Sequence, residues 1–209
     1  MDAAFENHLI RDEAALTALY GEPSPASLTK EVDYVHPHYA AIIKASPFMV
    51  LATSGPGGLD VSPRGDPAGF VTIADDRTLL IPDRRGNNRI DSLRNIVHDP
   101  RVALLFLIPG VGETLRVNGR AAISTAPDLI NRFEYRGTFP RSVIVVHVES
   151  VYFQCPKALV RSDLWNPEKH ASRKSLPSTG TILADVSNGT VGGEQYDREY
   201  PDRLRVTLY

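Results

Sequence analysis

The sequence predicts a mainly β fold of α+β character: a closed or nearly closed antiparallel barrel of six or more strands, with peripheral helices. Three observations carry this prediction. Short apolar or alternating runs recur between residues 48 and 155, tight turns separate neighbouring runs, and few helical segments lie between them. No glycine fingerprint follows a strand within a βαβ unit, so a dinucleotide-binding fold is not indicated.

Two hairpins open the predicted barrel. Residues 48–54 and 59–65 are expected to be strands joined by a tight turn at GPGG, and residues 69–74 and 78–82 to be strands joined at DDR. The run at 101–109 is almost wholly apolar, which is typical of a strand covered on both faces. Residues 113–124 alternate and should bend at Gly119, and residues 142–155 read as one long strand.

Helical patterns flank the strands. Residues 5–20 are amphipathic and stop at Gly21 and Pro23, and residues 36–46 stop before Pro47. Ile90, Leu93, Ile96 and Val97 are spaced for one buried helical face, with residues 87–89 expected in the first turn. Shorter helices are expected near 126–137 and 156–166. Three regions follow: an N-terminal helical extension (1–45), the barrel domain (46–166), and an irregular C-terminal extension (167–209) packing on it, whose last residues, RLRVTLY, could form an edge strand.

Composition excludes several classes of protein. The formal net charge is −2, so no global positive field attracts nucleic acid. No apolar run approaches the roughly 18 to 20 residues that span a bilayer, and the acidic N-terminus lacks the features of a signal peptide. Cys155 is the only cysteine, which excludes an internal disulfide framework. We therefore expect a cytoplasmic protein that binds neither membranes nor nucleic acid.

The stretch PDRRGNNR, residues 82–89, gathers cations and amide donors after a strand and before a helix. Unpaired backbone N–H groups at a helix N-terminus favour an anion, and arginine forms strong charge-assisted bonds with phosphate. The same residues could equally form a solvated turn. The local pattern leaves both interpretations open.

Three smaller features of the sequence give weaker evidence of function. His36 and His38 flank a proline, but two ligands from one short loop leave a zinc site incomplete, so no metal site is predicted. Cys155 is expected to behave as a small apolar side chain. Trp165 lies beside polar residues at an apparent boundary, where it could contact a cofactor or a second subunit.

Three segments together carry a resemblance to a known family. FMVLATSGPGGLDVSPRGDPAGFV, LLIPDRRGNNRIDSLRNIVHDPRVALLFLIPG and ETLRVNGRA closely resemble the flavin-binding pyridoxamine 5′-phosphate oxidase-like family over about residues 45–165. The resemblance implies a split β-barrel, a homodimer, and FMN held at the subunit interface.

The resemblance also implies the residues that bind the cofactor. Residues 61–66 would lie along the flavin ring and ribityl chain. Pro82 and Asp83 would meet the cofactor from the next strand, and residues 87–89 would lie at its phosphate. Thr114 would reach the ring from the neighbouring subunit, and three C-terminal residues would pack near the flavin. The full set is Val61, Ser62, Pro63, Arg64, Gly65, Asp66, Pro82, Asp83, Arg84, Asn87, Asn88, Arg89, Thr114, Lys157, Arg161 and Trp165.

Departures from the family pattern argue against the vitamin B6 oxidase itself. This chain has SPRGD where that oxidase has a longer basic segment, and Asn-Asn-Arg where it has Ser-Arg-Lys. The expectation is an FMN-dependent oxidoreductase acting on a small molecule, with Ser62 and Arg64 as hydrogen-bond donors to the ring. The alternatives are an F420-dependent reductase of the same fold, a flavin carrier without turnover, or a haem protein, for which His98 and His147 are the only histidines in core elements.

Overall fold

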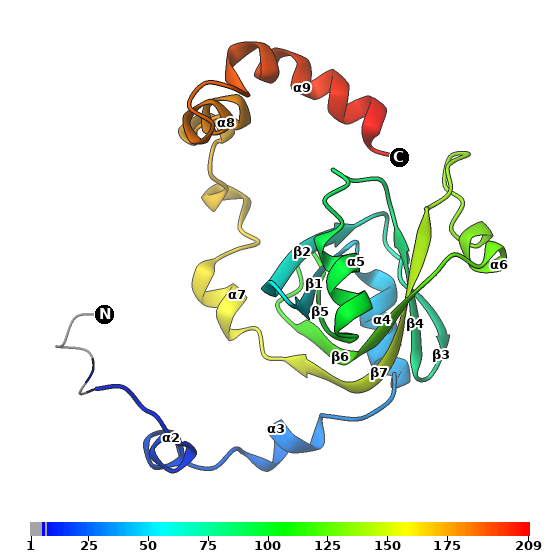
Figure 1. Cartoon of the computed structure of the whole chain (residues 1–209). Coiled ribbons are helices and arrows are strands. Elements are labelled where there is room, and N and C mark those ends of the chain that lie inside the picture. The colour runs from blue at the N-terminus through cyan, green and yellow to red at the C-terminus, as the bar shows by residue number, and fades with distance from the viewer. Residues whose placement is uncertain (1–5, 7) are drawn as a thin grey trace. The chain divides into compact units, whose positions relative to one another are not determined.

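The computed structural model describes residue 6 and residues 8–209, and the chain divides into two compact units, residues 1–31 and residues 32–209. The first unit contains helices α2 (Glu13–Tyr20) and α3 (Pro25–Thr29) (Figure 1). Asp12 caps α2, because its side chain accepts a hydrogen bond from the Ala15 N–H. The predicted helix over 5–20 is confirmed over Glu13–Tyr20 and at residue 6, residues 8–12 are not helical, and residues 5 and 7 lie outside the described part of the chain.

The second unit is built on one antiparallel sheet of seven strands, in the order β2-β1-β5-β6-β7-β4-β3. The strands are β1 (Phe48–Gly55), β2 (Gly58–Gly65), β3 (Thr72–Asp75), β4 (Thr78–Asp83), β5 (Arg101–Leu107), β6 (Thr114–Ser124) and β7 (Ser142–Gln154). Both predicted hairpins are confirmed, with Gly55 paired to Gly58 in the first. The predicted bend at Gly119 is confirmed as a register shift between Asn118 and Gly119.

The curled sheet (Figure 1) carries the larger of two hydrophobic clusters, and a smaller one joins Leu80, Phe133 and Val143. The larger cluster joins buried side chains of β1, β4, β5, β6 and β7, including Leu51, Ile81 and Phe106. Helix α4 (Pro37–Ala45) contributes Ile43, and helix α5 (Asp91–His98) contributes Ile96. The predicted buried face of α5 is wrong for Ile90 and Val97, which are exposed. The predicted split-barrel fold is confirmed. Strand β5 was expected to be covered on both faces, but its side chains alternate between buried and less buried positions.

The C-terminal region corrects the prediction of irregular structure over 167–209. After α6 (Pro127–Asn131) and α7 (Lys157–Ser162), two 3-10 turns, η1 (Pro167–Lys169) and η2 (Arg173–Ser175), lead to α8 (Thr179–Val186) and α9 (Gly193–Thr207). The stretch RLRVTLY belongs mostly to α9 and forms no edge strand. Its alternation was misleading because Pro201 lies just before it, and proline normally argues against a helix interior.

Within the described residues, no helix is both long enough and apolar enough to cross a membrane.

Candidate functional site

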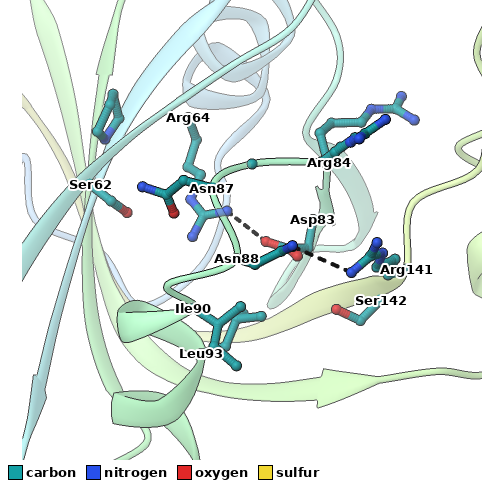
Figure 2. A pocket seen from close by; sticks show the side chains of 13 residues that line it. Ser62, Arg64, Asp83, Arg84, Asn87, Asn88, Ile90, Leu93, Arg141 and Ser142 are labelled. Carbon is teal, nitrogen blue, oxygen red and sulfur yellow. Dashed lines mark hydrogen bonds and ion pairs between the residues drawn. The ribbon is translucent and has the colours of Figure 1, made fainter. Parts of the chain in front are cut away.

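A cavity of about 450 Å³ opens where the end of β2 faces the end of β4 and the loop that follows it (Figure 2). Its volume is in the range of small-molecule sites. The walls come from β2, from the loop between β4 and α5, from the first turns of α5, and from the start of β7. They consist of Ser62, Pro63, Arg64, Asp83, Arg84, Arg85, Gly86, Asn87, Asn88, Ile90, Leu93, Arg141 and Ser142.

The loop before α5 has an unusual backbone. Asn88 and Ile90 both adopt left-handed conformations, with φ of 60° and 53°. Asparagine tolerates this region, but for a β-branched isoleucine it is strained. Because these residues are not helical, α5 begins at Asp91, and the prediction that residues 87–89 form its first turn is wrong. The Asn87 side chain instead accepts a hydrogen bond from the Arg89 N–H at 3.0 Å.

Two ion pairs cross between β2 and β4, which do not pair with each other in the sheet. Arg64 on β2 donates to Asp83 on β4 at 2.6 Å. Arg84, directly after β4, donates to Asp66, directly after β2, at 2.7 Å. All four side chains are largely buried, with Asp66 only 3% exposed. These pairs fix the positions of both cavity walls, since removing either partner would leave a poorly solvated charge.

Other donors on the arginines at the cavity have no carboxylate partner within residues 6 and 8–209. Nε of Arg64 is buried and has no hydrogen-bond partner within residues 6 and 8–209. Arg85 lines the cavity and makes no ion pair in that part of the chain. Among the described residues, Arg141 donates only to the Asn88 side-chain oxygen, at 3.4 Å. The cavity therefore has an excess of positive charge, which favours an anionic ligand.

Ser62 is tied into a short chain of hydrogen bonds. Its hydroxyl lies 3.0 Å from that of Ser92, which in turn donates to the Asp60 carboxylate at 2.7 Å. Because Ser92 has a single proton and gives it to Asp60, Ser62 must be the donor to Ser92. Ser62 therefore presents only acceptor capacity to the cavity, unlike the donor role expected from the sequence.

The remaining predicted site residues lie outside this cavity. Val61 is exposed on β2, and Gly65, Asp66 and Pro82 do not line the wall. Arg89 forms an ion pair with Asp91 at 2.7 Å, and its side chain is 75% exposed. That pairing raises the pKa of Arg89.

A second group of predicted residues belongs to another part of the unit. Thr114 begins β6 and contacts the Gln154 side chain at 3.4 Å. Trp165 donates from its indole nitrogen to the Val111 carbonyl at 2.8 Å. Lys157 and Arg161 lie on α7, and neither lines the cavity between β2 and β4.

Arg141 is the main cavity residue that the sequence interpretation missed. It directly precedes β7, and the pairing of Asp83 with Ser142 brings it beside the end of β4. A prediction of that strand pairing would have found it. Ile90, Leu93 and Ser142 were also missed as lining residues.

Among the residues that the structure describes, no cluster of three or more histidine, cysteine or acidic side chains could hold a metal ion. His98 and His147 are both exposed, and neither lines the cavity.

The fold and the lining residues define a split-barrel protein with a cationic cavity. The model of the pyridoxamine 5′-phosphate oxidase family matches residues 35–155, more than half of the chain, and the chain belongs to this family. That segment contains the whole sheet and every residue that lines the cavity.

Three solved structures illustrate the similarity. A point variant of HupZ from Group A Streptococcus is 17% identical, with 57% of this chain and 99% of that chain covered and a TM-score of 0.48. General Stress Protein 26 from Bacillus anthracis is 19% identical, with coverages of 55% and 88% and a TM-score of 0.41. An FMN-binding protein from Syntrophomonas wolfei is 13% identical, with coverages of 55% and 86% and a TM-score of 0.41. No curated protein matches the chain.

Proposed function

We propose that this protein is an FMN-binding flavoprotein that acts as an oxidoreductase on a small molecule. One observation carries the proposal: a cavity in the family's barrel domain has a cationic loop at one side and a buried, unsatisfied donor at the other. FMN has a dianionic phosphate and a planar ring with hydrogen-bond acceptors, so both features have a counterpart in the ligand.

The phosphate is assigned to the loop before α5. Arg85 and Arg141 supply guanidinium groups without ion-pair partners in residues 6 and 8–209, and Asn87 and Asn88 supply amide donors. Arg89 is a third candidate cation. Its pair with Asp91 is solvent-exposed, and such pairs contribute little, so a phosphate dianion would displace the Asp91 carboxylate.

The ring is assigned to the wall formed by Ser62, Pro63 and Arg64. The ion pair with Asp83 holds the Arg64 guanidinium in place, and its Nε–H still lacks an acceptor. Leu93 and Ile90 add apolar surface on the other side of the cavity (Figure 2). When bound, FMN supplies hydride or electron transfer, and the chain's residues bind and orient it.

We further propose that the site is completed in a homodimer. Thr114, Lys157, Arg161 and Trp165 are absent from the cavity of one chain, and a partner subunit would bring its own copies to the flavin. The edge strand β2 supports this proposal, because Leu59 is 88% exposed and Val61 is 65% exposed beside the site. Large exposed apolar side chains on an edge strand favour association.

The experiment is a titration of the purified protein with FMN, followed by flavin absorbance and fluorescence. The proposal expects micromolar or tighter binding of FMN. Parallel titrations with F420 and haem test the two alternatives, since haem gives a Soret band. Binding of F420 or haem in preference to FMN would overturn the assignment, as would the absence of any flavin binding at micromolar concentration.

The dimer is tested by light scattering on the FMN-loaded protein. If two subunits share the site, the molecular mass in solution should be twice that of the chain. A monomer that retains FMN with full affinity would refute the shared site.

A further inference from the structure

A second cavity lies on the other side of the loop that borders the proposed FMN site. Its volume is about 420 Å³, and α9 forms the opposite wall. The lining residues are Arg85, Gly86, Asn87, Asn88, Tyr200, Arg203, Leu204, Thr207 and Leu208. The two cavities share the loop residues 85–88, so one short segment presents polar groups to both.

Arg203 is the unusual group in this second cavity. Its guanidinium lies over the Tyr196 ring at 4.0 Å and 5.7 Å from the Tyr200 ring. Its Nη2 is buried and has no hydrogen-bond partner, and the guanidinium makes no ion pair within residues 6 and 8–209. A partly buried cation with an unused donor is costly unless an anion approaches it.

The wall formed by α9 is held to the barrel by Tyr209. Its hydroxyl donates to Asp66 at 2.8 Å, and its ring lies 4.9 Å from that of Tyr135. The Arg84 guanidinium lies 5.8 Å from the Tyr209 ring. Arg84 and Asp66 form the ion pair beside the first cavity, so both cavities are anchored by the same residues.

The chemistry of the lining selects a class of ligand. Arg85 and Arg203 suit a phosphate group, which arginine binds with charge-assisted hydrogen bonds. The Tyr200 ring and the leucines Leu204 and Leu208 suit a planar organic group, as in stacking of a base on an aromatic side chain. We infer that this cavity binds a nucleoside phosphate, at a site distinct from that of the FMN phosphate.

The nucleotide could be a free molecule or the ADP portion of a longer flavin, because both present the same chemistry to Arg203. ADP is therefore titrated into the FMN-loaded protein and into the unloaded protein by calorimetry, and FMN and FAD affinities are compared. If ADP binds and the protein has equal affinity for FAD and FMN, the ligand of this cavity is a free nucleotide. If FAD binds more tightly than FMN and Arg203→Ala removes this difference, the ligand is the ADP portion of the flavin cofactor.

The variants separate this cavity from the FMN site. Arg203→Ala should weaken ADP about tenfold or more and leave FMN within about twofold. Arg85→Ala should weaken both ligands, because Arg85 lines both cavities. Arg205→Ala is the matched control on the same helix: Arg205 is exposed, pairs with Asp202 and lines neither cavity, so both affinities should be unchanged.

Circular dichroism establishes that each variant is folded, and Arg203→Gln replaces Arg203→Ala if the latter is not. Failure of wild-type protein to bind ADP at millimolar concentration would overturn the inference. So would ADP binding that is equal in wild type and Arg203→Ala. If FMN fails to bind while ADP binds in an Arg203-dependent manner, the proposed function is wrong and the nucleotide site stands.

Discussion

At the residue scale, Arg84 and Arg85 are neighbours with opposite environments. Arg84 donates to Asp66 at 2.7 Å and to the Phe133 carbonyl at 2.8 Å, and only 17% of its side chain is exposed. Arg85 is exposed and lines both cavities without an ion pair in residues 6 and 8–209. Arg84 is therefore a structural residue, and Arg85 is available to a ligand.

Substitution of these two arginines should separate stability from binding. Arg84→Ala leaves the buried Asp66 carboxylate without its cationic partner, with only the Tyr209 hydroxyl as a donor, and should lower the free energy of unfolding by about 3 kcal/mol. Arg85→Ala should change it by less than about 0.5 kcal/mol, as expected for a surface substitution. Urea denaturation measures both. Equal losses of stability would contradict the different roles of the two arginines.

Asp91 competes with a bound phosphate for Arg89 in the proposed site. Asp91→Asn should release Arg89 and remove a negative charge, so FMN should bind a few-fold more tightly, by roughly two- to fivefold. Riboflavin, which has no phosphate, should be unaffected. Asp99→Asn is the matched control, because Asp99 also pairs with an arginine two residues away, at the other end of α5. Unchanged FMN affinity in Asp91→Asn would remove Arg89 from the phosphate site.

At the element scale, the strands were predictable because their signals are local. GPGG places a turn between β1 and β2, and alternation or short apolar runs mark the strands on either side. The start of α5 was not predictable in the same way. Left-handed Asn88 and Ile90 delay the helix to Asp91, and isoleucine gives no sequence signal for that conformation.

Residues that depend on pairings distant in the chain were the hardest to predict. Arg141 reaches the cavity only because β7 pairs with β4 in one register, across a separation of about sixty residues between Asp83 and Ser142 that no local pattern reports. Helix α9 was misread because Pro201 lies inside it, and proline normally argues against a helix interior. Arg203 was missed with it.

The contact that holds α9 should be sensitive to alkaline pH. The hydrogen bond from Tyr209 to Asp66, followed by burial, raises the pKa of Tyr209. A raised pKa in the folded state means that this contact stabilises the fold below pH 10 and is lost as the pH rises through the higher value.

Absorbance at the phenolate band, measured against pH, checks this directly. Wild type should show a late-titrating fraction, and Tyr209→Phe should lose part of it, whereas the contribution of Tyr39, whose pKa is raised by burial, remains. If Tyr209→Phe loses phenolate absorbance only from the fraction that titrates near pH 10, the ordinary tyrosine value, Tyr209 does not bond to Asp66.

At the scale of the whole molecule, the site depends on where the barrel is split. Strands β2 and β3 are the two edges of the sheet, and the ion pairs Arg64–Asp83 and Arg84–Asp66 join the ends of β2 and β4 across the opening. The sequence predicted a barrel and the stretch that borders its cavity. The sequence did not show which arginines would form these ion pairs and so be less available to a ligand. The pairs depend on how β2 and β4, which are not neighbours in the sheet, lie in the folded chain.

The central claim is that the loop before α5 binds the phosphate of FMN, and the ratio of riboflavin to FMN dissociation constants tests it most directly. Wild type should favour FMN by about 100-fold or more, and the double variant Arg85→Ala/Arg89→Ala should reduce that ratio to about tenfold or less, with riboflavin affinity unchanged. Arg94→Ala, an exposed arginine of α5 outside the cavity, should keep the wild-type ratio. Equal affinities of the wild-type protein for FMN and riboflavin would contradict the claim.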